Sequence, residues 1–211
     1  MNIFSMDSAF YRFISRLGDL MVLNVLFLIG CAGIITIGPS LTAMYTVLLK
    51  LVRNESGYIA REYWRAFRDN FRQAAVLWGI SMLLGVLLYF DIIMSDLAGG
   101  AAAGGLKIVF LFFGMIYVSV LSYLFAVQSR FENTIWNTVK NSFWMAVGYL
   151  PFTISVLVLE LLPLFIILVR PQMFWYLLPV MLTVGFGAVG YVCAYIFNHI
   201  FKNYMPSEEM E

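Results

Sequence analysis

The chain has 211 residues, of which 62% are hydrophobic and only 12% are charged, and its mean hydropathy is +0.87. A soluble domain is about half apolar and about one quarter charged, so this composition excludes a disordered chain and a water-soluble globule. The formal net charge of +1 gives no basic field for nucleic acid. We therefore expect an all-α, polytopic helical membrane protein in which residues 1–211 form a single integral membrane domain.

The amino-terminal residues 1–18 are predicted to form an amphipathic helix at the membrane interface, because apolar side chains recur there every three to four residues. A helical hairpin at 20–52 follows, with Gly38-Pro39 as its turn. The second arm, 40–52, is short for a segment that must cross about 30 Å of hydrocarbon. Asp19 is expected to cap the first arm, and Asn24 to hydrogen-bond between helices.

Apolar runs and basic connections alternate through the rest of the chain, giving about six membrane segments in all. Between two of these segments the stretch DLAGGAAAGG at 96–105 is expected to be a flexible linker. After the first hairpin we expect a cytoplasmic amphipathic helix at 53–73, a hairpin at 74–127, a cytoplasmic helix at 128–142, a hairpin at 143–201 and a cytoplasmic tail at 202–211.

The distribution of Lys and Arg predicts the orientation, because cytoplasmic loops carry the excess of positive charge. If 20–52 crosses the membrane twice, only Lys107 and Arg170 lie outside. If it crosses once, Arg12 and Arg16 move outside as well. The first arrangement fits better, so both termini are expected in the cytoplasm of a multi-pass bacterial plasma-membrane protein.

Two segments resemble each other at an offset of 72 residues, since Trp64, Arg68 and Ala74 correspond to Trp136, Lys140 and Ala146. One reading is a parallel internal repeat, which is a known transporter plan. The other reading is that the similarity is a coincidence, because amphipathic helices beside membranes share the same composition.

The segment from Arg53 to Arg72 has the most distinctive pattern in the chain. From Ala60 onward, aromatic and basic side chains follow two adjacent stripes at helical spacing. One interpretation is an interfacial helix with arginines at lipid headgroups. The other is a docking helix for a partner, since aromatic residues and Arg are enriched at interface hot spots. The partner-binding residues predicted on this second interpretation are Arg61, Trp64, Arg65, Phe67, Arg68 and Phe71.

A polar site is conceivable where a helix begins after Thr36, because a helix amino terminus offers free N–H groups. The alternative is that Ser40 and neighbouring hydroxyls only satisfy the backbone at a tight turn. Glu160 is an ionisable residue inside an apolar run and is therefore a functional candidate. The alternative is that Glu160 has no functional role and lies at the outer interface, paired with Lys107 or Arg170. The polar-site candidates are Thr36, Gly38, Pro39, Ser40 and Glu160.

Catalytic chemistry is not indicated. The sequence has no phosphate-binding loop, no H-E-x-x-H and no G-x-S-x-G motif. One His and two distant Cys cannot form a zinc site of the usual spacing. We therefore predict no catalytic residues, no metal site and no cofactor.

Three stretches resemble the YesL family of bacterial membrane proteins: TIGPSLTAMYTVLLKLVR at 36–53, GYIAREYWRAFRDNFRQA at 57–74 and WNTVKNSFWMAVGYLP at 136–151. The resemblance implies a plasma-membrane protein with an accessory role beside carbohydrate ABC importers. Together with the docking helix, it predicts a non-enzymatic accessory protein whose partners are the lipid bilayer and sugar ABC transporter subunits. The alternative is a small solute transporter or channel, suggested by the repeat, the Gly38-Pro39 break and Glu160.

Overall fold

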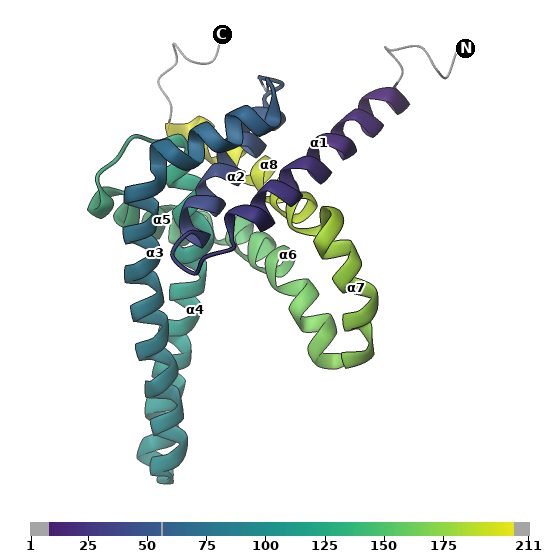
Figure 1. Cartoon of the computed structure of the whole chain (residues 1–211). Helices are drawn as coiled ribbons and strands as arrows, with labels where there is room; N and C mark the ends of the chain where they lie inside the picture. Colours follow the sequence, from purple (N-terminus) through teal and green to yellow (C-terminus); the bar gives the residue numbers. More distant parts are fainter. Residues whose placement is uncertain (1–8, 56, 205–211) are drawn as a thin grey trace.

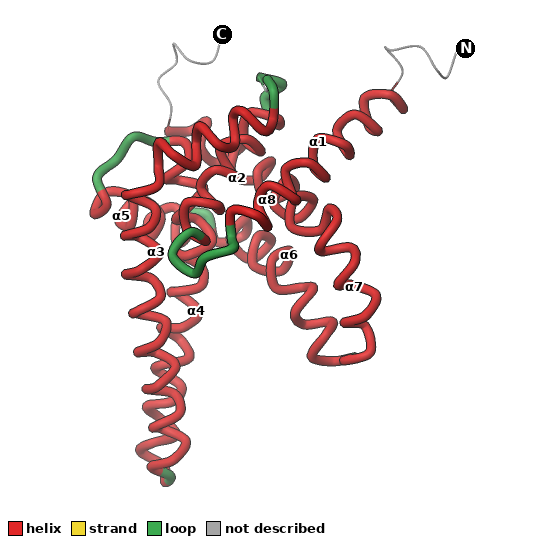
Figure 2. Tube along the Cα trace, viewed as in Figure 1, coloured by secondary structure: helices red, strands yellow, loops and turns green. Residues whose placement is uncertain are grey.

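The computed structural model describes residues 9–55 and 57–204, and all regular structure in these ranges is helical (Figures 1 and 2). This confirms the all-α polytopic class. Short 3₁₀ or π turns lie at Pro171–Met173, Met181–Gly185 and Lys202–Tyr204. The α-helices are α1 (Ala9–Gly30), α2 (Ile37–Val52), α3 (Ile59–Ala98), α4 (Gly100–Arg130), α5 (Ile135–Gly148), α6 (Leu150–Val169), α7 (Phe174–Val180) and α8 (Phe186–Phe201).

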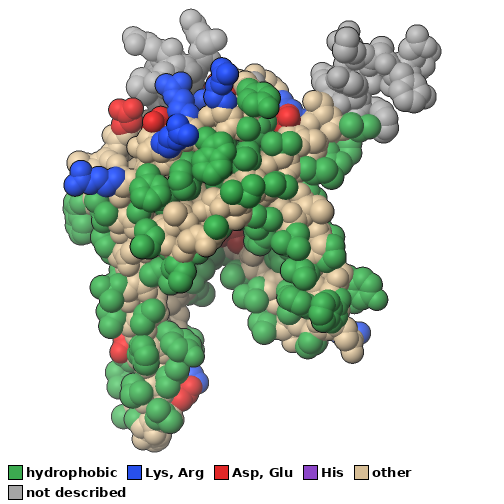
Figure 3. All heavy atoms as spheres, viewed as in Figure 1, with side chains coloured by type: hydrophobic (Ala, Val, Ile, Leu, Met, Phe, Trp, Pro, Cys, Tyr) green, Lys and Arg blue, Asp and Glu red, His purple; other side chains and the backbone are tan. Residues whose placement is uncertain are grey.

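Five helical stretches of the described chain are long and apolar enough to cross a membrane. They give two hairpins, α3–α4 and the shorter α6–α7, whose tips point away from the end that carries the first and last described helices (Figure 1). Apolar side chains cover both hairpins, as expected of surfaces that face lipid (Figure 3). The qualifying stretches are Phe13–Gly30, Ile59–Ala98, Ala102–Arg130, Leu150–Val169 and Pro171–Tyr204.

Helix α2 forms the centre of the bundle. Its 16 residues extend about 24 Å, which is less than the hydrocarbon core of about 30 Å. Most of its side chains are buried, and it packs against α3, α4 and α8. A helix that is apolar on all sides belongs inside protein. The short second arm of the expected first hairpin is therefore mainly a core element.

Helices α2 and α3 come very close at Gly38. A Cβ atom built on this glycine would lie 2.5 Å from the backbone oxygen of Ala74 and 2.6 Å from Cβ of Trp78. Only a residue without a side chain fits this approach. Pro39 follows in the first turn of α2, where a missing N–H costs no helical hydrogen bond.

The carboxyl end of α2 is tied to α1. Asn54 adopts a left-handed conformation with φ of 60°, which asparagine tolerates and which stops the helix. The guanidinium of Arg16 donates a hydrogen bond of 2.5 Å to the backbone oxygen of Leu51, and a second one to the side chain of Asn54. Arg16, expected at the lipid interface, thus caps a neighbouring helix.

A polar side chain of α1 hydrogen-bonds to the backbone of an irregular turn before α8. At Met181–Gly185 the helix widens into a π turn, shortly after Pro179. The Asn24 amide donates to the backbone oxygens of Met181 at 3.0 Å and Leu182 at 2.9 Å. Its own oxygen accepts a 2.9 Å hydrogen bond from the Gly187 N–H. The prediction that Asn24 bonds between helices is confirmed.

Several expected boundaries need correction. Helix α1 runs from Ala9 to Gly30 without a break, so the separate interfacial helix is wrong for residues 9–18, and Asp19 lies inside the helix instead of capping it. The first arm of the expected hairpin at 20–52 ends at Gly30, well before the expected turn at Gly38-Pro39. Residues 1–8, Ser56 and residues 205–211, which include most of the expected tail, lie outside the described part of the chain.

The expected linker at 96–105 is also wrong. Helix α3 continues to Ala98 and α4 starts at Gly100, so the connection is a tight turn. Gly99 and Gly100 have φ of 62° and 84°, a conformation that glycine adopts without strain. Beside this turn Lys107 pairs with Asp96 at 2.6 Å. Alanines are strong helix formers, and here they outweigh the neighbouring glycines.

The first arm of the hairpin expected at 143–201 is divided at Tyr149, between α5 and α6. Pro151 explains the break, because it has no N–H to donate to the Val147 carbonyl and its ring would clash with that carbonyl, whereas proline is tolerated in the first turn of a new helix. The Thr153 hydroxyl donates to the Ala146 carbonyl at 2.8 Å, which satisfies one group freed by the break. By contrast, α3 continues without a break through Leu77, the residue that matches Tyr149 at the offset of 72 residues. The two halves of the suspected repeat therefore differ in structure.

Candidate functional site

The first turns of α3 carry an aromatic row that packs inward. We use this name for Tyr63, Trp64, Phe67 and Phe71. Successive ring centroids lie 5.4 Å apart for Tyr63–Trp64, 5.4 Å for Trp64–Phe67 and 5.6 Å for Phe67–Phe71. Tyr63 is fully buried, and Trp64 and Phe67 pack against the core. The aromatic row therefore fixes this part of α3 onto the bundle.

The adjacent basic stripe consists of Arg61, Arg65, Arg68 and Arg72, and all four side chains are exposed. Arg65 is 83% exposed and lies 3.7 Å from Asp69, a contact of the kind that contributes little to stability. Beside the stripe is an open groove of about 460 Å³ that Tyr58 and Trp64 also line. Lys and Arg side chains gather at this end of the molecule (Figure 3). The predicted partner-binding arginines thus share one accessible face.

The polar groups at the start of α2 are already engaged by the protein. The Thr36 hydroxyl donates to the backbone oxygen of Gly33 at 2.7 Å and accepts from its N–H at 3.1 Å. Ser40 is fully buried, donates to the Phe27 carbonyl at 3.0 Å and lies 2.6 Å from the Tyr63 hydroxyl. Gly38 and Pro39 are buried too. These four candidates therefore lie in a closed turn.

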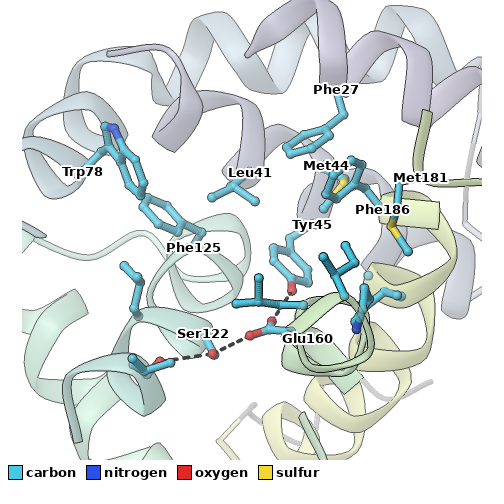
Figure 4. A pocket seen from close by; sticks show the side chains of 17 residues that line it. Phe27, Leu41, Met44, Tyr45, Trp78, Ser122, Phe125, Glu160, Met181 and Phe186 are labelled. Atoms are coloured by element: carbon cyan, nitrogen blue, oxygen red, sulfur yellow. Dashed lines mark hydrogen bonds between the residues drawn. The ribbon is translucent and has the colours of Figure 1, made fainter. Parts of the chain in front are cut away.

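Glu160 lies elsewhere, halfway along α6. Its carboxylate accepts hydrogen bonds from the hydroxyls of Tyr45 at 3.2 Å and Ser122 at 2.5 Å (Figure 4). The alternative in which Glu160 pairs with Lys107 is not found, since Lys107 pairs with Asp96. The two parts of the candidate polar site do not meet, because the groove around Glu160 includes none of the α2 turn candidates.

This central groove has a volume of about 510 Å³ and is lined from α1, α2, α3, α4, α6 and α8. Figure 4 shows Tyr45 and Ser122 pointing towards Glu160, with the rings of Phe27, Trp78 and Phe125 also lining the groove. The sequence did not single out Tyr45 or Ser122. They lie 115 and 38 residues from Glu160 in the chain, so no local pattern connects them.

Neither a metal centre nor a disulfide is formed by the residues at 9–55 and 57–204. No group of three or more His, Cys, Asp or Glu side chains gathers there to hold a metal ion. Cys31 and Cys193 are free thiols, and Cys193 is buried. The arrangement offers surfaces and a groove for binding, with Glu160 as the one acidic side chain that lines the groove.

Comparison with known proteins gives distant relatives. A family model described as "Protein of unknown function, DUF624" matches residues 20–92. The uncharacterized protein YteU of Bacillus subtilis (strain 168) is 24% identical over 163 residues, which are 77% of this chain and 73% of YteU. The uncharacterized protein YesL of the same strain is 28% identical over 140 residues, 65% of each chain. No solved structure matches significantly.

Proposed function

We propose that this helical membrane protein, which is similar to the uncharacterized proteins YteU and YesL, is a non-enzymatic accessory protein that binds a partner complex through the basic stripe of α3. This proposal rests on one observation: the start of α3 is held firmly on the core, yet its arginine side chains are exposed. The aromatic row holds the helix on the core, while the arginines beside it stay exposed. The helix backbone of this surface is already ordered, so binding has to order only the arginine side chains.

In this proposal the two stripes have different roles. Arg61, Arg65 and Arg68 contact the partner, because guanidinium groups bind carboxylates with two parallel hydrogen bonds. Trp64, Phe67 and Phe71 mainly hold the helix in place, although Phe71 is 39% exposed and reaches the same surface. The partner we propose is a carbohydrate ABC importer, as the resemblance to the YesL family implies. Its contact surface should be acidic, to complement the arginines.

Co-purification from the native membrane tests this proposal. Replacing Arg61, Arg65 and Arg68 together by alanine should lower the yield of co-purified importer subunits at least about tenfold, because interface arginines are frequent hot spots. A matched variant, Lys107→Ala with Arg170→Ala, removes positive charge from the hairpin tips and should change nothing. Importer subunits that never accompany the wild-type protein would contradict the proposal, as would full retention by the triple variant.

The proposed location is the bacterial plasma membrane, with both termini and the basic stripe in the cytoplasm. The first and last described helices and the basic stripe lie at one end of the molecule, and the hairpin tips at the other (Figures 1 and 3). The positive-inside rule then favours the cytoplasm for the basic end.

Cysteine labelling with a membrane-impermeant maleimide tests this orientation. Gly104→Cys, on an exposed site with nothing within 4 Å of the new Cβ, should react in intact cells. Arg61→Cys should react only after the cells are opened, and the chain without added cysteine gives the background. Labelling of position 61 from outside intact cells would reverse the proposed topology.

A small solute transporter is the second candidate function. One observation favours it, the groove that surrounds Glu160 among helices long enough to cross the membrane. Intramembrane acidic residues frequently mark solute or ion paths.

A further inference from the structure

The central groove has the size and shape of a small-molecule site. Its volume of about 510 Å³ lies within the usual range for ligand pockets, about 300–1,000 Å³. It opens among helices whose outer surfaces are apolar, and the molecular surface is hollowed between the two hairpins (Figure 3). A ligand could therefore reach it from the lipid phase.

Glu160 has no positively charged partner among the side chains that line the groove. Its hydrogen-bond partners Tyr45 and Ser122 are neutral hydroxyl donors. No Lys, Arg or His is among the residues that line the groove. A carboxylate in an apolar environment is costly unless a cation accompanies it, so a positively charged ligand would be stabilised there.

Aromatic rings in the groove provide further contacts for a cationic ligand. Five aromatic side chains line the groove, and two pairs of them lie close together, Phe27 with Phe186 at 5.6 Å and Trp78 with Phe125 at 6.1 Å between centroids. The Trp78 indole is held by a 2.8 Å hydrogen bond to the Ile34 carbonyl. Ring faces attract organic cations, and quaternary cations in particular are bound by aromatic cages.

We infer that the central groove binds a hydrophobic organic cation, with its charge near Glu160 and its apolar body against the rings of Phe27, Trp78, Phe125 and Phe186. A carboxylate alone would favour any cation, including a small hydrated one. The apolar lining selects against strongly hydrated ions, because they would lose their water without replacement. This inference does not depend on the proposed docking role of α3, so either can fail alone.

Equilibrium dialysis with radiolabelled tetraphenylphosphonium tests the inference on the full-length protein in lipid nanodiscs. We expect saturable binding, with displacement of the probe by other hydrophobic quaternary cations. Glu160→Gln should weaken binding at least about tenfold, because it removes the charge but keeps the shape. Glu132→Gln, at an exposed acid that does not line the groove, is the matched control.

A second pair of variants separates charge from ring contacts. Phe125→Leu should weaken binding about two- to fivefold through lost cation–π attraction, whereas Phe113→Leu, an exposed ring on the same helix, should not. Tetraphenylborate, an anion of the same shape, should not bind saturably. Equal binding of both probes by the wild-type protein would mean that the groove only accepts lipid chains or other apolar matter. That result, or unchanged affinity in Glu160→Gln, overturns the inference.

Discussion

Replacing Gly38 by alanine is expected to lower the free energy of unfolding by about 1–3 kcal/mol, the usual range for overpacking a closely packed core. The new methyl group would lie 2.5 Å from a backbone oxygen of α3, a distance that real Cβ atoms essentially never show. Backbone cannot rotate away as a flexible side chain can. Helices α2 and α3 would have to separate, and α2 is the centre of the bundle.

Reversible unfolding in mixed micelles with increasing SDS would measure this effect. Gly79→Ala is the control, because Gly79 lies in α3 with nothing within 4 Å of a new Cβ. Alanine there should leave stability unchanged or raise it by up to about 1 kcal/mol through helix propensity. If both substitutions behaved alike, the close contact between α2 and α3 would be refuted.

Replacing Asn24 by leucine is expected to cost about 2–4 kcal/mol. The change removes the hydrogen bonds of the Asn24 amide to the Met181 and Leu182 carbonyls and to the Gly187 N–H, and a buried group left unsatisfied costs about 1–3 kcal/mol. The full sum is not expected, because single hydrogen bonds between membrane helices average only about 0.6 kcal/mol. Leucine keeps the branched shape of asparagine but is larger, so overpacking at this fully buried position contributes part of the cost.

The same unfolding measurement applies to Asn24→Leu. Asn137→Leu serves as its control, because it removes an exposed amide from α5 and should change the free energy of unfolding by less than about 0.5 kcal/mol. Amide hydrogen exchange adds a local readout, with faster exchange expected at Gly187. An unchanged exchange rate at Gly187 would show that Asn24 does not support the π turn.

The fold class was predictable because the hydropathy of a segment indicates whether lipid or water surrounds it. The resemblance to YesL-like proteins is confirmed by the distant relatives. Asn24 was recognisable as a polar residue inside an apolar run. Its partners were not, since they lie 157, 158 and 163 residues away. The break at Tyr149 had a local signal in Pro151, which the apolar pattern of the whole segment concealed.

For the candidate sites, too, the features set by local sequence were predictable and those set by tertiary packing were not. The basic stripe follows from helical spacing alone, so the sequence contains it. The surroundings of Glu160 depend on which faces of α2, α4 and α6 meet, and helix packing is not encoded in any short window. Gly38 was noticed as a turn residue, whereas its close approach to Ala74 depends on tertiary structure.

The unequal lengths of the two hairpins have a consequence for the surrounding lipid. The 40 residues of α3 extend about 60 Å, and the 20 residues of α6 only about 30 Å, which matches a hydrocarbon core of about 30 Å. In the proposed topology both ends of α3 lie in water, the basic first turns inside and the turns around Asp96 outside, so the outer end of the α3–α4 hairpin projects beyond the lipid. Only the middle of α3 therefore has to match the thickness of the hydrocarbon, and the surrounding lipid does not have to stretch to cover the whole helix.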